Sequence, residues 1–160
     1  MKAIPGNQVE STFPLIQHKR RRKAVIMIAE WDSSYSLGVD KIDEQHKTLF
    51  SIINKLYDGI LRQQEKETLD QVLDEMISYT SEHFRTEEEL MLAIKFPSFE
   101  SHQSEHQGMT EKLKVFQLQY HEGKQNLGVE VLNELIDWLH QHLGETDAKI
   151  RPFLEQNGKR

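Results

Sequence analysis

The sequence contains no cysteine among its 160 residues. Disulfide bonds, iron–sulfur clusters, zinc ribbons and thiol catalysis are therefore excluded, and the absence is consistent with an intracellular, cytoplasmic location. Breakers of regular structure are scarce, with 4 prolines and 8 glycines, while charged residues make up 29% of the chain. This balance favours a helix-rich protein. No apolar run approaches the roughly 20 residues that cross a bilayer, so we expect no membrane span.

Negative charge dominates, but it is unevenly distributed. The net charge is −6, and residues 1–29 contribute +5 because six Lys and Arg residues there face only Glu10. The remaining residues sum to −11, which argues against nucleic acid as a partner. Residues 1–29 show no amphipathic period, so we predict a flexible basic N-terminal tail ahead of one domain in residues 30–160. A basic surface anchor is the alternative role for this tail, and Met27 is an alternative start.

Four segments carry apolar residues at helical spacings of three and four. They span about Asp40 to Leu61, Thr68 to Ile94, Ser98 to Glu122 and Gly128 to Leu143. The second is expected to open at Thr68, because Thr68 and Gln71 form a capping-box pattern, and Gly123 is expected to end the third. Short connections favour antiparallel neighbours. The predicted fold is therefore all-α, an up-down-up-down four-helix bundle.

Histidines and carboxylates recur one helical turn apart on these segments. His83 and Glu87 are four residues apart, as are His102 and His106, so each pair shares one helix face. Imidazole and carboxylate groups on one face are typical metal ligands. A lone helical histidine is more often a surface or core residue, but here all four helices offer a candidate. Facing helices can converge on a metal in a bundle core.

The extended pattern resembles the hemerythrins, and more narrowly the single-domain bacteriohemerythrins. The matching residues are Gly38-Val39-Asp40-x-Ile42-Asp43-x-Gln45-His46, His83-Phe84-x-x-Glu87-Glu88, Pro97 ahead of His102-x-x-x-His106, and Trp138-Leu139-x-x-His142-x-x-x-x-Asp147. The resemblance covers about Trp31 to Leu154, and all seven ligand positions of the family are matched in type and order. The long basic tail is the one departure from the family pattern.

The resemblance implies a non-haem di-iron centre with an oxo or hydroxo bridge. Its ligands would be His102, His106 and His142 on one iron, His46 and His83 on the other, and Glu87 and Asp147 as bridges between them. Two octahedral irons offer about twelve coordination positions, and this set leaves one free, on the iron with two histidines. The implied function is reversible binding of dioxygen there, for storage or for delivery to oxygen-requiring enzymes, by a monomer.

The interval between His142 and Asp147 carries a structural expectation of its own. Five residues on a straight α-helix separate two side chains by about 140°, so both can ligate only if the backbone bends between them. Gly144 lies in that interval and could relax the chain. We predict that the fourth helix is irregular or ends there.

Reversible binding without oxidation also requires a dry pocket above the free position. The candidates, chosen by helical adjacency to ligands, are Leu49, Phe84, Trp138 and Leu143. The alternative is that these four are ordinary core residues, and both roles are compatible because pocket walls belong to the core.

Other functions fit parts of the pattern. A ferritin-like di-iron enzyme would use Glu-x-x-His pairs, which this chain lacks, so we expect a binding protein and no enzyme. A di-iron oxygen or redox sensor, or an iron-handling protein, is the alternative, although sensing usually needs an attached output domain. A structural zinc site would use only four of the seven ligands.

Overall fold

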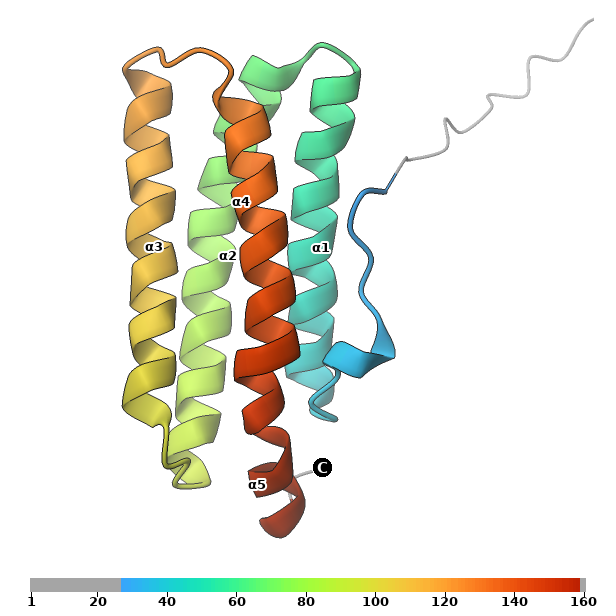
Figure 1. Ribbon diagram of the computed structural model, residues 1–160, viewed down its shortest axis with the longest axis vertical. Coiled ribbons are helices and arrows are strands. Elements are labelled where there is room, and N and C mark those ends of the chain that lie inside the picture. Colours follow the sequence, from blue (N-terminus) through green and yellow to red (C-terminus); the bar gives the residue numbers. More distant parts are fainter. Residues whose placement is uncertain (1–26, 159–160) are drawn as a thin grey trace, which may run out of the picture.

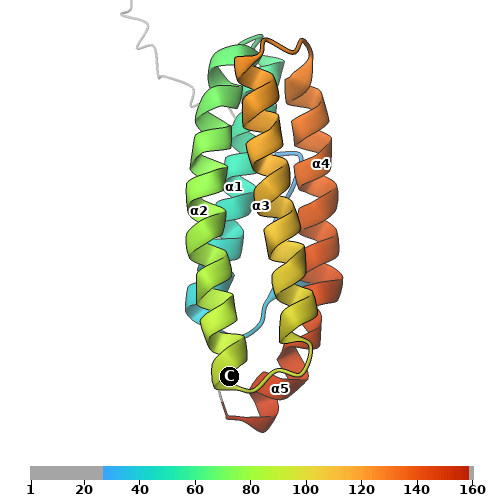
Figure 2. The same ribbon diagram turned by 90° about the vertical axis from the view of Figure 1, so that its left-hand side faces the viewer.

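The computed structural model describes residues 27–158, and these form an all-helical bundle (Figure 1). The four long helices are α1 (Asp40–Leu61), α2 (Glu65–Ala93), α3 (Phe99–His121) and α4 (Leu127–Gln141). Connections of three to five residues join them at alternating ends, so consecutive helices run antiparallel (Figures 1 and 2). The predicted four-helix bundle is confirmed. Within the described part of the chain, no helix is long and apolar enough to cross a membrane.

The core consists of two apolar clusters with a polar layer between them. The larger cluster fills most of the bundle and includes Leu49 and Phe84. The smaller one, with Ile42 and Met91, lies at the end of the bundle where α5 closes it. Burying 27 apolar side chains in this way is the main favourable term in folding. The polar layer between the clusters holds the candidate site.

Helix α2 begins three residues earlier than the capping-box pattern predicts, so the expected start at Thr68 is wrong. The Thr68 N–H already donates to the Gln64 carbonyl at 3.1 Å, so Thr68 lies inside the helix. Only three residues connect α1 to α2, and Thr68 packs beside Gly59 of α1. A Cβ on Gly59 would meet the Thr68 Cβ at 2.6 Å. The tight connection and this close approach outweigh the local capping preference.

The chain changes helix type after α4. The segment η2 (His142–Thr146) is π-helical, η3 (Asp147–Lys149) is a 3₁₀ turn, and α5 (Arg151–Gln156) follows. The predicted irregularity between His142 and Asp147 is therefore confirmed. Helix α5 was not expected from the sequence, and with it Ile150 and Leu154 become fully buried parts of the smaller cluster.

The segment before α1 packs along the bundle. Asn54 of α1 accepts hydrogen bonds from the backbone N–H groups of Ile28 (2.8 Å) and Ala29 (3.2 Å), and donates to the Ala29 carbonyl (2.6 Å). Lys47 lies 4.8 Å above the ring of Trp31. Residues 28 and 29, at the end of the predicted tail, are therefore held against α1. Met27 is exposed, and residues 1–26 of the tail lie outside the described residues.

Candidate metal centre

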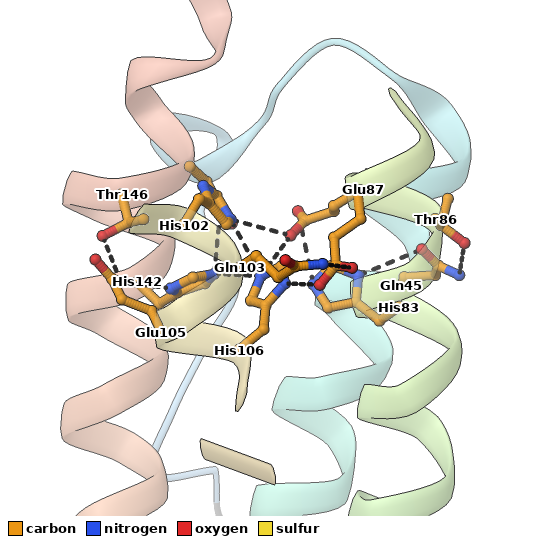
Figure 3. A network of polar contacts seen from close by, with 12 residues as sticks. Gln45, His83, Thr86, Glu87, His102, Gln103, Glu105, His106, His142 and Thr146 are labelled. Atoms are coloured by element: carbon orange, nitrogen blue, oxygen red, sulfur yellow. Dashed lines mark hydrogen bonds and ion pairs between the residues drawn. The ribbon is translucent and has the colours of Figure 1, made fainter. Parts of the chain in front are cut away.

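The seven side chains predicted as ligands come together in the polar layer. Figure 3 shows His83, Glu87, His102, His106 and His142 among them. Helix α1 supplies one, α2 and α3 supply two each, and the segments η2 and η3 supply one each: His46, His83, Glu87, His102, His106, His142 and Asp147. Each is between 0% and 2% exposed. Burial of five imidazoles and two carboxylates is expensive unless they are paired or bind metal, so a group this polar inside a bundle indicates a function.

The π-helical segment brings the last two residues into the site. In a π-helix the backbone bonds join residues five apart, so a five-residue interval is close to one turn. Accordingly, His142 Nε2 lies 3.2 Å from Asp147 Oδ1. The two side chains that a straight α-helix would point apart therefore face the same centre.

The two carboxylates lie between two groups of histidines. Glu87 Oε1 is 3.3 Å from His46 Nε2 and 3.6 Å from His83 Nε2. The other oxygen, Oε2, is 3.6 Å from His102 Nε2 and 3.3 Å from His106 Nε2. Each oxygen of Glu87 thus faces a different group of imidazoles.

Asp147 divides its oxygens in the same way. Its Oδ2 lies 3.3 Å from His46 Nε2, whereas Oδ1 lies 3.3 Å from His102 Nε2 and 3.2 Å from His142 Nε2. The donors consequently form two sets, one with three histidines and one with two, joined by both carboxylates. This arrangement matches the requirements of two metal ions that share carboxylate bridges.

Several inward-pointing atoms have no hydrogen-bond partner. Both carboxylate oxygens of Asp147, Oε2 of Glu87 and Nε2 of His83 are in this condition within the described residues. Nε2 of His106 also lies only 3.1 Å from Nε2 of His102 and 3.1 Å from that of His142. Three ring nitrogens that converge on one point can share a bound cation through their lone pairs. The donor set therefore fits a pair of metal ions.

Electrostatic coupling shifts the titration of these groups strongly. Burial acts to lower the pKa of His46, but the Asp147 and Glu87 carboxylates outweigh it and raise the pKa to about 9. The pKa of His102 is likewise raised to about 9, against its burial, by the same two carboxylates. Burial lowers the pKa of His83 to about 4 despite the nearby Glu87. Burial opposes ionisation of Asp147 and Glu87 too, yet the surrounding imidazoles hold the pKa of each below its usual range.

The outer nitrogens of three imidazoles bind polar side chains. His106 Nδ1 lies 3.0 Å from Glu88 Oε1, and His142 Nδ1 lies 3.1 Å from Glu105 Oε2. His83 Nδ1 lies 3.3 Å from the amide oxygen of Gln45. These outer partners were not predicted as part of the site. They could have been anticipated, because an imidazole that points Nε2 inward carries an Nδ1–H group that needs a hydrogen-bond acceptor.

Aromatic rings cover two of the imidazoles. Phe84 stacks on His106 with ring centres 3.9 Å apart, and Trp138 stacks on His142 with ring centres 4.4 Å apart. Phe84 and Trp138 contact each other edge to face, with centres 5.8 Å apart. Together these rings form an apolar cover on one side of the centre.

A small apolar cavity of about 10 Å³ lies one helical turn from the histidines. It is lined by Leu49, Ile53, Met76, Thr80, Met109, Leu135, Trp138 and Leu139. The Thr80 hydroxyl donates to the Met76 carbonyl at 2.7 Å, so it leaves no free polar group there. Of the four predicted pocket residues, Leu49 and Trp138 line this cavity. Phe84 borders a surface cleft between α2 and α3, and Leu143 is fully buried in the core.

The remaining histidines lie away from the centre. His140 is exposed and contacts the rings of Tyr35 and Phe50, with centres 5.9 Å away in both cases. His121 is exposed at the end of α3, and His18 lies outside the described residues. None of these three is among the predicted ligands, and the two that the structure describes lie outside the group of seven.

The fold and site define a class of protein, a four-helix bundle that binds cations through buried histidines and carboxylates. A family model described as the hemerythrin HHE cation binding domain matches residues 37–154. The chain therefore belongs to the hemerythrin family.

Individual relatives agree with this assignment. The chain is 29% identical over 123 residues to a bacteriohemerythrin of Clostridium acetobutylicum, covering 74% of this chain and 95% of that protein. It is 29% identical over 122 residues to the bacteriohemerythrin of Methylococcus capsulatus, covering 76% and 92%. A solved hemerythrin structure superposes with a TM-score of 0.73 at 26% identity, covering 81% of this chain and 98% of that one.

Proposed function

We propose that this chain reversibly binds dioxygen at a non-haem di-iron centre and serves in oxygen storage or delivery in the cytoplasm, as a monomer and without catalysis of its own. The observation that carries the proposal is the unequal division of histidines, three against two, around two shared carboxylates. Hemerythrin and bacteriohemerythrin are also the names of its relatives. The alternative functions are iron handling and the sensing of oxygen or redox state.

The proposed ligand division follows the contacts of the carboxylate oxygens. His102, His106 and His142 would hold one iron, His46 and His83 the other, with Glu87 and Asp147 shared and an oxo or hydroxo bridge between them. Of about twelve positions on two six-coordinate ions, one would then be free, on the two-histidine side. The iron pair would supply the binding position for dioxygen and the two electrons that it takes up reversibly.

The chain itself contributes the exclusion of water. Half of the residues that line the apolar cavity belong to α1 and α2, the helices that carry His46 and His83, and the other half belong to α3 and α4. A cavity of this size and composition favours a small apolar molecule over a hydrated anion. The stacked rings of Phe84 and Trp138 cover one face of the His106 and His142 imidazoles and shield it from solvent. Irreversible oxidation of the iron to the ferric form, which water or anions entering the site would promote, should be slow in such a site.

The test is spectroscopic. We expect protein loaded anaerobically with ferrous iron to contain about two iron ions per chain, and to develop a visible absorption band on admission of oxygen that vanishes on deoxygenation. His83→Ala should abolish this reversible band, because it removes one of only two histidines on the open iron. His140→Ala is the matched control, since this exposed histidine lies outside the site, and it should behave as the unaltered protein.

Two results would overturn the proposal. A one-way change to a stable ferric spectrum, or turnover in the presence of a reductant, would replace the carrier with an iron-oxidising or catalytic protein. A metal content near one ion per chain would remove the di-iron assignment.

A further inference from the structure

The two groups of histidines differ in what holds their outer nitrogens. In the group of three, His106 and His142 each place Nδ1 against a carboxylate, Glu88 at 3.0 Å and Glu105 at 3.1 Å. In the group of two, His83 meets only the neutral amide of Gln45. Nδ1 of His46 has no hydrogen-bond partner among the described residues, and neither has Nδ1 of His102. Carboxylate support is therefore confined to one side of the centre.

The two supporting carboxylates are themselves held in place. Glu105 Oε2 accepts a second hydrogen bond, 2.8 Å long, from the hydroxyl of Thr146 in the π-helical segment. Glu88 Oε2 accepts one of 2.9 Å from the side-chain amide of Gln103 on α3. Figure 3 shows the contact between Glu105 and Thr146. Each carboxylate is thus aimed at its imidazole by a neighbouring donor, which a chance surface contact would lack.

A carboxylate at Nδ1 changes the imidazole as a ligand. It fixes the proton on Nδ1, which frees the Nε2 lone pair for the metal, and its negative charge makes that lone pair a stronger donor. A neutral amide oxygen fixes the same proton with less effect on the donor strength. The group of three also offers one more imidazole. The supporting carboxylates and the additional imidazole both favour tighter binding at the three-histidine position.

We propose that Glu105 and Glu88 are positioning residues that make the three-histidine position the tighter of the two, so that this protein takes up its metals in a fixed order, three-histidine side first. The inference deepens the proposed function and depends on it only in requiring two metal positions. Dioxygen plays no part in it.

The experiment is an anaerobic titration of the metal-free protein with Co²⁺, followed by visible absorption and by calorimetry. The unaltered protein should bind in two steps, with the first at least about tenfold tighter than the second. Glu105→Gln keeps a hydrogen-bond acceptor but removes the charge, and should weaken the first step by about 10–100-fold while changing the second by less than about threefold. Glu88→Gln should act in the same direction and serves as the second variant if Glu105→Gln does not fold.

A reciprocal change tests the same idea from the other side. Gln45→Glu should tighten the second step, because it gives His83 the carboxylate that it lacks. Glu145→Gln is the matched control: this exposed residue loses the same charge, next to Thr146, without any described contact to a histidine, and both steps should keep their affinities.

The possible outcomes separate clearly. A single step of uniform affinity in the unaltered protein, or equal weakening of both steps by Glu105→Gln, would overturn the proposal. Two ordered steps with a selective effect would support it even if the iron form failed to release oxygen, so failure here and failure of the oxygen-binding function are distinguishable.

Discussion

At the scale of single residues, His46 and His83 share one buried site but titrate in opposite directions. Two carboxylates keep His46 protonated to about pH 9, whereas burial keeps His83 neutral down to about pH 4. The difference arises because His46 contacts both Glu87 and Asp147, at 3.3 Å each, while His83 is 3.6 Å from Glu87 alone. The metal-free site therefore holds protons that bound metal ions must displace.

This titration predicts how metal-free protein responds to alkali. The folded pKa of His46 and of His102, about 9, exceeds the ordinary 6.5, so their contribution to stability is fully present below pH 6.5 and is lost as the pH rises through 9. A pKa shift of this size in one group corresponds to roughly 3 kcal/mol in the free energy of unfolding. Urea denaturation of the metal-free protein should accordingly show a lower free energy of unfolding at pH 9 than at pH 6.5.

Metal-loaded protein is the control, because its imidazoles are already neutral and its stability should change far less over that range. Equal stability of the metal-free protein at both pH values would contradict the prediction.

The residue scale also shows what the sequence could reveal of the site. Spacings of four residues singled out His83, Glu87, His102 and His106. Positions on predicted helices made His46 and His142 candidates too, and the family resemblance added Asp147. The pairing of His142 with Glu105 was out of reach, because it joins η2 to α3 across 37 residues, and no local period encodes a contact between helices. That the seven side chains bind metal remains a prediction, which the Co²⁺ and iron experiments test.

At the scale of helices, two glycines in helix interiors have opposite surroundings. Gly59 of α1 faces Thr68 so closely that an added Cβ would lie 2.6 Å from the Thr68 Cβ. Gly108 of α3 has no atom within 4 Å of the same position. One glycine permits two helices to approach, whereas the other only weakens its own helix.

These surroundings predict opposite signs for the same substitution. Gly59→Ala should destabilise the bundle by about 1–2 kcal/mol through overpacking, even after the gain in helix propensity. Gly108→Ala should stabilise it by about 0.5–1 kcal/mol, because alanine restricts the unfolded chain and favours the helix. Thermal or urea unfolding of the two variants side by side decides the matter, and a gain in stability from Gly59→Ala would refute the close-approach argument.

Sequence periodicity located the helices but missed some of their ends. The bounds of α1, Asp40 and Leu61, were predicted as the structure has them, since apolar residues at helical spacings mark much of its length. The start of α2 was set by packing against Gly59, which a local capping pattern does not include. Helix α5 has only six residues, too few to display a period, and its burial depends on the distant smaller cluster.

At the scale of the whole molecule, the centre connects all four long helices or their immediate extensions. One or two buried polar side chains from each element meet there, between the two apolar clusters. Oε2 of Glu87 and both carboxylate oxygens of Asp147 lack hydrogen-bond partners within the described residues, an arrangement that lowers the stability of the folded state unless a cation binds there. Bound metal should therefore act as a cross-link within the bundle.

The prediction is a metal-dependent melting temperature. Metal at a hundredfold excess over its Kd should raise the free energy of unfolding by about 2.7 kcal/mol. For a chain of this length this corresponds to a rise in Tm of roughly 5–10 °C. Removal of the metal with a chelator should reverse the gain. His102→Ala should lose most of the metal-dependent rise, while His121→Ala, at the exposed end of α3, should retain it. A rise of equal size in both variants would place the metal elsewhere.

The π-helical segment has a consequence for how such sites are recognised in unfamiliar sequences. Two pairs of predicted ligands here are four residues apart on α-helices, and the third pair is five apart across the π-helical segment η2. In all three pairs the two side chains lie one helical turn apart and point toward the same centre. A search that accepts only four-residue intervals would count two pairs and miss the third. A motif search for metal sites in helical bundles should therefore also accept ligand intervals of five residues, because a π-helical turn holds one more residue than an α-helical turn.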